Sequence, residues 1–277
     1  MIVEWRLFEA GHCLHPEIAS RRDGALRPCQ FPALATLLRH REHGWLLFDT
    51  GYAEHFLHAT TPFPERLYRW VTPVRMREDE PLARQLRSAG IAADDIAWIL
   101  LSHLHGDHVA GVADFPRARI ACSDEAWNDL RRRGRFAATR QGFLPALLDS
   151  ATGRRQSFEA SPRARMPAAL RGFDPGHDFF GDGSLLLVPL PGHAPGHYGL
   201  WFEDGDGPVF LVADAAWSSD ALRRGVPPPA LVSAWLGDRD AYLQTLARLQ
   251  ALQQAQPSLR IVPSHCRDWR PRGHRDA

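Results

Sequence analysis

The chain has 277 residues, long enough for one large domain, and its 44% apolar content is ordinary for a protein with a buried core. Its net charge of +1 argues against nucleic-acid and membrane partners, and no run of ~18 uncharged apolar residues is present to cross a bilayer. The N-terminus lacks a signal-peptide pattern and the four cysteines form no CxxC pair, so we expect a cytoplasmic protein with reduced thiols.

The first ninety residues predict strands, then a loop-rich segment, then a helix. Alternation in residues 2–8 predicts a half-buried strand, and the apolar runs 33–40 and 44–51 flank a charged turn, which predicts a hairpin. Three prolines rule out a long regular element in residues 61–74. Residues 80–90 have Pro near the first turn and Gly after the last, which predicts a helix.

The remaining residues predict further strands, two helices and one irregular segment. Ser123 or Asp124 can cap a helix over residues 125–133, and residues 238–254 form an amphipathic pattern with Asp238 near its start. Residues 134–180 are Arg-rich and predict no regular element. Apolar runs predict the strands 96–102, 118–124, 184–190, 197–203, 208–214 and 259–265. This mixture predicts sheets covered by helices.

A dense group of metal-ligand residue types follows the predicted buried strand 96–102. The stretch LSHLHGDHVAG places His103, His105, Asp107 and His108 within six positions. Imidazole and carboxylate are the ligands that hold Zn, Mn or Fe in hydrolytic sites. A tight turn at the end of a strand directs several such ligands into one cavity, so the motif predicts a metal site.

Three later strand-like runs each end in a potential ligand or lead into one. His193 follows the run 184–190, Asp214 ends the run 208–214, and His265 ends the last run. Each residue alone is better explained by a surface histidine or by an aspartate that begins a turn. In series after the HxHxDH motif, they predict a shared metal site at one edge of the sheets.

The order HxHxDH, a distant Gly-His, an Asp at a strand end and a final His resembles the metallo-β-lactamase-fold hydrolase superfamily. The DTG at 49–51 is similar to an early motif of that family, and the resemblance spans roughly residues 31 to 266. It implies a four-layer αββα sandwich of α/β class with a two-metal site. We expect one domain over residues 1–277, with insertions at about 55–78 and 131–180.

The resemblance also implies a role for each ligand. One metal would be held by His103, His105 and His193, the other by Asp107, His108 and His265, with Asp214 bridging the two and Asp49 orienting the ligand loop. The ions would be divalent, zinc being the first choice and Mn, Fe or Co the alternatives. A hydroxide shared by the two metals would attack the substrate, and Asp107 would pass a proton to the departing alkoxide.

Within the superfamily, the chain is most similar to the quorum-quenching N-acyl-homoserine lactonases. The similarity rests on SHLHGDHVAG, PGHAPGH and the absence of a separate C-terminal domain. It implies hydrolysis of a lactone or a related carboxylic ester, a small-molecule substrate. The chain departs from those lactonases at Trp217, where they typically have Tyr. Two alternatives are a phosphodiesterase using the same two metals and a non-catalytic metal-binding or ligand-binding protein.

Aromatic and basic residues outside the motif yield paired hypotheses. Phe63, Tyr68 and Trp70 form either an apolar wall for an acyl or aromatic group or the contact of a homodimer, and Trp217 either lines the pocket or packs in the core. We expect His197 to be a hydrogen-bonded structural residue.

Segment 131–171 has ten Arg against two acidic residues, an excess of eight. It predicts either a solvated or partner-facing surface or a basic rim that attracts an anionic substrate.

Overall fold

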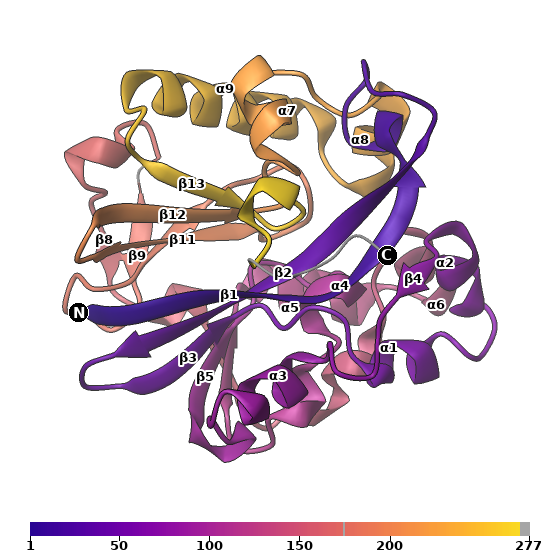
Figure 1. Ribbon diagram of the computed structural model, residues 1–277, viewed down its shortest axis with the longest axis horizontal. Coiled ribbons are helices and arrows are strands. Elements are labelled where there is room, and N and C mark those ends of the chain that lie inside the picture. Colours follow the sequence, from indigo (N-terminus) through magenta and orange to yellow (C-terminus); the bar gives the residue numbers. More distant parts are fainter. Residues whose placement is uncertain (174, 272–277) are drawn as a thin grey trace.

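The computed structural model describes residues 1–173 and 175–271, which contain one seven-stranded and one six-stranded sheet (Figure 1). In spatial order the first sheet consists of β4 (Val74–Arg75), β1 (Ile2–Pro16), β2 (Pro28–His40), β3 (Gly44–Phe48), β5 (Ile96–Leu100), β6 (Arg119–Cys122) and β7 (Arg155–Ser157). The second consists of β13 (Arg260–Pro263), β12 (Gly207–Ala213), β11 (Tyr198–Asp204), β10 (Leu186–Pro189), β9 (Gly176–Asp178) and β8 (Arg163–Ala164).

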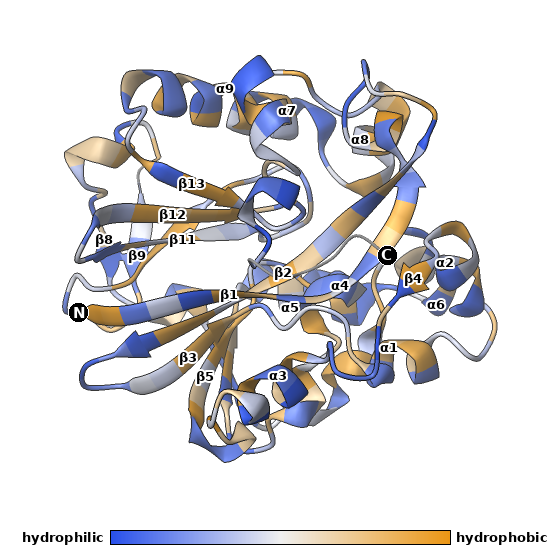
Figure 2. Ribbon diagram, in the orientation of Figure 1, coloured by the Kyte–Doolittle hydropathy of each residue, from blue (hydrophilic) through white to orange (hydrophobic). Residues whose placement is uncertain are grey.

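Helices cover the outer face of each sheet. The helices are α1 (Glu54–Ala59), α2 (Arg66–Val71), α3 (Leu82–Ser88), α4 (Gly106–Val109), α5 (Asp124–Arg132), α6 (Arg135–Arg140), α7 (Ser219–Arg224), α8 (Ala230–Leu236) and α9 (Arg239–Ala255). One apolar core lies between the sheets, a second joins the first sheet to helices α1–α6, and a third joins the second sheet to α7 and α9. Figure 2 shows the apolar strands between more polar helices. This arrangement confirms the predicted four-layer αββα sandwich.

Most of the longer predicted elements are present close to their expected bounds. β2 and β3 form the predicted antiparallel hairpin. The side chain of Ser123 caps α5 by accepting from the N–H of Glu125, and Asp238 caps α9 in the same way. Strand β1 is longer than predicted and pairs with β2 over most of its length. None of the helices within the described residues is long and apolar enough to cross a membrane.

The prediction that residues 134–180 lack regular structure is wrong. This segment contributes α6, then β7 at the edge of the first sheet, and then β8 and β9 at the edge of the second. Each of these strands has only two or three residues. So short a run cannot show the period-two alternation by which a strand is recognised in a sequence.

Strand direction brings five loops to one edge of the sandwich. β3 and β5 run parallel in the first sheet. In the second sheet β10 and β12 are both antiparallel to β11, so they share one direction, and β13 is parallel to β12. The residues that follow the carboxyl ends of these five strands are therefore gathered together, as the sequence pattern predicted.

The carboxylate of Asp204 ties the two sheets together at the opposite end of β11. It accepts a hydrogen bond from Trp5 Nε1 of β1 at 2.6 Å and forms a bidentate pair with Arg260 of β13. The Arg260 guanidinium is the main reason that the pKa of Asp204 falls from 3.8 to about 2.

Asp204→Asn is expected to lower the free energy of unfolding by about 2 kcal/mol at about pH 7, because the pKa shift of Asp204 is a stability contribution. The folded-state pKa lies below the unfolded one, so this contribution is complete above pH 3.8 and is lost as the pH falls to about 2. Urea unfolding at both ends of this range measures the difference. Asp206→Asn, which changes an exposed carboxylate in the same hairpin, is the control. A difference that does not shrink in acid would contradict the prediction.

Candidate metal centre

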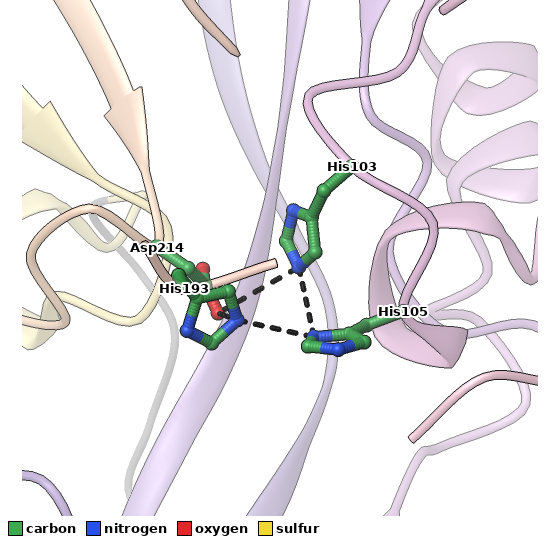
Figure 3. Close-up of side chains that lie close together, drawn as sticks. All are labelled: His103, His105, His193 and Asp214. Atoms are coloured by element: carbon green, nitrogen blue, oxygen red, sulfur yellow. Dashed lines mark hydrogen bonds and ion pairs between the residues drawn. The ribbon is translucent and has the colours of Figure 1, made fainter. Parts of the chain in front are cut away.

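Three imidazoles and one carboxylate converge where the two sheets meet at the edge described above (Figure 3). Nδ1 of His105 lies 3.0 Å from Nε2 of His103 and 3.1 Å from Nε2 of His193. Oδ2 of Asp214 lies 3.1 Å from the same nitrogen of His193. All four side chains are buried, and their ligand atoms lie within 4.8 Å of one another. We call these residues the first cluster.

A second cluster, formed by Asp107, His108 and His265, adjoins the first through Asp214. Oδ2 of Asp107 lies 3.5 Å from Nε2 of His265 and 3.8 Å from Nε2 of His108. The two oxygens of Asp214 lie 3.3 Å from Nε2 of His108 and 3.1 Å from Nε2 of His265. The structure thus brings together all seven residues that the sequence proposed as ligands, with Asp214 in contact with both groups.

The outer nitrogens of three imidazoles, those of His103, His108 and His265, have polar partners that direct the inner nitrogens at the clusters. The Nδ1 proton of His265 goes to the carbonyl oxygen of Pro32 at 2.8 Å, and that of His108 goes to Asp49 at 2.8 Å. His103 Nδ1 lies 3.0 Å from the hydroxyl oxygen of Ser102, which itself donates to Asp49. Neutral imidazoles with inward lone pairs beside carboxylates suit divalent cations, so the residues present fit the predicted ions.

The pKa values differ between the two clusters. Burial lowers the pKa of His103 and His105 well below the ordinary range, and neighbouring imidazoles add to the effect, which favours the neutral form that a metal requires. Burial acts in the same direction on His108 and His265, but nearby carboxylates, above all Asp214, raise the pKa of both. In turn these imidazoles hold the pKa of Asp214 well below its usual range despite burial.

The loops that carry the ligands contain strained or sterically constrained backbone. Among the described residues, Asp49 (φ 59°) and Ala213 (φ 45°) are the only non-glycine residues with positive φ, and both lie beside the clusters. Gly192, before His193, has φ 127°, and a Cβ there would lie 2.1 Å from the backbone nitrogen of Tyr242. Only glycine allows the His193 loop to approach α9 this closely.

Asp49→Asn is expected to weaken metal binding by ~10–100-fold, the usual effect of losing a partner that orients a ligand. Asp49 accepts from the N–H and hydroxyl of Ser102 and from His108, whereas asparagine would turn an amide N–H₂ toward one of these donors. Asparagine tolerates the left-handed backbone of this position. Competition with a chelating dye measures the affinity. Asp114→Asn alters a comparable pair with His55 outside both clusters and is the control; equal affinity in the two variants would contradict the prediction.

A third group with metal-ligand residue types, His40, His43 and Asp182, does not offer the same lone pairs. Nδ1 of His40 accepts from the backbone N–H groups of Glu42 and His43, both at 3.1 Å. Its Nε2 is occupied as well, since it lies 2.8 Å from the Met1 ammonium, 2.9 Å from the Ser184 hydroxyl oxygen and 3.2 Å from Asp182. This group is accounted for by hydrogen bonding between the β2–β3 turn and the β9–β10 loop.

A cavity of about 1000 Å³ opens beside both clusters, and its lining is mostly apolar. Of the predicted pocket residues, Tyr68, Trp70 and Trp217 line it. Phe63 is absent from the lining and packs edge to face on Phe136, which does line the cavity.

His197 supports the loop that carries Asp214. It accepts a hydrogen bond from the backbone N–H of Asp214 at 3.2 Å, and burial lowers its pKa to about 3, so the ring is neutral.

Most arginines of the 131–171 segment do not reach the cavity. Among the ten, only Arg140 lines it. Arg155 pairs with Asp124, Arg133 with Asp129, and Arg154 donates to backbone carbonyl oxygens. The structure thus favours the first hypothesis, a solvated or partner-facing surface, over a basic rim around the entrance.

Sequence reasoning missed several contributors to the site. Ser102 and Ser264 precede the ligands His103 and His265, and their hydroxyls donate to Asp49 and Asp214. The sequence feature that could have identified these two serines is their position directly before a ligand histidine. The cavity is also lined by α8, which was not predicted because its mixed apolar run shows no clear helical period.

Comparisons with known sequences agree with this geometry. A model of the metallo-beta-lactamase superfamily matches residues 30–265. The chain is 31% identical to the N-acyl homoserine lactonase AttM of Azorhizobium caulinodans, over 69% of this chain and 71% of that protein. It is 27% identical to a probable metallo-hydrolase of Mycobacterium tuberculosis, over 83% of this chain and 73% of the other.

Solved structures share the fold at lower sequence identity. A structure of AiiA from B. thuringiensis with N-decanoyl-L-homoserine bound superposes with a TM-score of 0.70 at 20% identity, covering 97% of this chain and 95% of that one. AidC, a dizinc quorum-quenching lactonase, gives 0.62 at 20% identity, with 96% and 89% covered. The chain therefore belongs to the metallo-β-lactamase superfamily and is a metal-dependent hydrolase.

Proposed function

We propose that the protein hydrolyses a lactone or a related carboxylic ester with an apolar acyl or aromatic group, and that N-acyl-homoserine lactones are the first substrates to test. One observation carries this proposal: both clusters border a largely apolar cavity, into which Asp107, Asp214 and His265 project from its wall. The names of the relatives support it, because AttM is an N-acyl homoserine lactonase and AiiA was solved with N-decanoyl-L-homoserine at its active site.

The seven clustered residues would hold two divalent ions. His103, His105 and His193 would bind one, the second cluster would bind the other, and Asp214 would contact both. Zinc is the first choice, supported by the dizinc relative, with Mn, Fe or Co as alternatives. Such ions supply Lewis acidity and a nucleophilic water at neutral pH.

Asp107 and Trp217 are placed to act on the substrate directly. Asp107 lines the cavity and its side chain is 12% exposed, so it can hold a proton and pass it to the departing alkoxide. The ring of Trp217 packs edge to face on those of His193 and His265, with centroids at 6.0 and 6.3 Å. Its Nε1–H has no hydrogen-bond partner among the described residues, which suits a donor to a substrate oxygen.

The lining of the cavity favours a neutral ester over the alternative phosphodiester. Arg140 is the only arginine among the described lining residues, and its guanidinium lies 5.3 Å from the ring centroid of Trp235. Phosphodiester sites commonly use several cationic donors to match the phosphate charge. The remainder of this lining is dominated by aromatic and aliphatic side chains from α2, α6 and α8.

A substrate panel on protein of measured metal content tests the proposal. We expect turnover of γ-lactones that increases with the length of an apolar acyl chain, and much slower turnover of phosphodiesters, whose charge does not match the apolar lining; thioesters and β-lactams complete the panel. Initial rates at matched concentrations give the comparison. Hydrolysis of a generic phosphodiester with none of γ-lactones would reverse the order of the two hypotheses.

A further inference from the structure

The entrance of the cavity is surrounded by exposed apolar side chains, which we call the mouth face. Trp70, Val71 and Leu231 are 67%, 71% and 77% exposed. The mouth face comprises Phe63, Leu67, Trp70, Val71, Phe136, Leu231 and Trp235. All but Phe63 also line the cavity. Helices α2, α6 and α8 lie on the same side of the molecule (Figure 1), and α2 and α8 carry apolar stretches in Figure 2.

The mouth face forms one connected surface. The rings of Phe63 and Phe136 join α6 to the residues before α2, with centroids 5.3 Å apart. The indole N–H of Trp235 on α8 donates to the carbonyl oxygen of Arg140 at 2.5 Å, which joins α8 to α6. Exposed apolar residues are common singly, but a contiguous group of this size usually marks a surface that is covered by a partner.

The charge on this surface is entirely positive within its helices. α2 and α6 contain Arg66, Arg69, Arg135 and Arg140 and no acidic residue, and α8 contains no charged residue. Arg135 pairs with Glu65. The other three arginines make no ion pair with any residue that the structure describes. A partner for this face must therefore offer both apolar contact and negative charge.

We propose that the mouth face docks on an anionic lipid bilayer. Apolar side chains flanked by arginine suit the boundary between acyl chains and phosphate headgroups, where tryptophan is also favoured. A second copy of the chain fits less well, because a two-fold contact sets a patch against itself and would bring arginine against arginine. The same contact would cover the cavity entrance.

This inference departs from the expectation, drawn from the net charge of +1, that the protein has no membrane partner. The charge of the whole chain is close to zero, but the four arginines on α2 and α6 are concentrated at one apolar surface. Docking through this face would place the cavity entrance against the bilayer. If the proposed acyl-lactone activity is correct, apolar substrates dissolved in lipid would then enter directly.

Sedimentation of the metal-loaded protein with vesicles tests the docking without reference to activity. We expect the partition coefficient to be at least about tenfold higher on vesicles containing phosphatidylglycerol than on pure phosphatidylcholine, and to fall with added salt. Trp70→Gln combined with Val71→Gln should lower binding about tenfold on the anionic vesicles, because the exposed apolar contact is lost. Arg66→Gln combined with Arg69→Gln should lower it about 25-fold, about fivefold for each charge.

Val3→Gln combined with Arg41→Gln is the matched control. It removes one exposed apolar residue and one exposed arginine near the N-terminal end of β1 and the β2–β3 turn, and should bind as wild type does. Thermal unfolding verifies that each variant is folded. The proposal is overturned if wild type does not sediment with anionic vesicles, or if the Trp70 and Val71 variant binds equally well. It is also overturned if light scattering shows a dimer that this variant converts to monomers, since a second copy would then occupy the face.

Discussion

Replacing Asp214 by alanine is expected to lower lactone turnover by about a thousandfold, the factor that corresponds to a loss of ~4 kcal/mol of transition-state stabilisation. Asp214 is the one carboxylate in contact with both clusters: its oxygens lie 3.1 Å from Nε2 of both His193 and His265 and 3.3 Å from that of His108. Its removal leaves the neighbouring imidazoles without the carboxylate that they share, so both clusters should lose their cations. Steady-state kinetics together with metal analysis of each variant gives the measurement.

Two further variants separate this effect from general unfolding. Asp214→Asn keeps the volume of the side chain and the hydrogen bond from its backbone N–H to His197 but removes the charge, so it should be nearly as inactive. Asp206→Ala removes an exposed carboxylate from the turn before β12 and should retain wild-type rates. Near-normal turnover in Asp214→Ala that still binds two metal ions would contradict the bridging role.

The ligand set could be predicted because each ligand follows the end of an apolar strand. Runs such as 96–102 and 208–214 are recognisable by composition alone, and His103 and Asp214 stand at their ends. Parallel or co-directed strands then place these ends at one edge, a consequence of sheet geometry that does not depend on the intervening residues. The architecture followed from the same pattern together with the family resemblance.

The cavity wall could not be predicted in the same way, because it depends on which distant side chains pack together. Phe63 and Phe136 are 73 positions apart, and the sequence offered no reason to place Phe136 at the cavity and Phe63 outside it. Cys13 of β1 lines the cavity only because β1 extends well beyond its alternating portion. Tertiary contacts of this kind have no local signature.

Removal of divalent ions with a chelator is expected to abolish turnover completely, and readdition of zinc or manganese should restore it. His105 Nδ1 lies 3.0 and 3.1 Å from Nε2 of His103 and of His193, and burial lowers the pKa of the first two residues, so neutral rings can direct three lone pairs at one cation. Without the cation, the site loses the Lewis acid and the nucleophilic water that it would supply. Turnover measured before chelation, after it and after readdition gives the test.

The same reasoning predicts a stability change that does not depend on any substrate. A cation that binds the folded clusters and not the unfolded chain stabilises the protein by mass action, so the chelated protein should unfold at a lower temperature or urea concentration. Added metal should stabilise the Asp49→Asn variant less than wild type, because His108 and Ser102 lose the carboxylate that accepts their hydrogen bonds. A chelated, metal-free preparation with full activity and unchanged stability would show that the converging side chains have another purpose, because neither catalysis nor folding would then require the cations that this geometry is suited to hold.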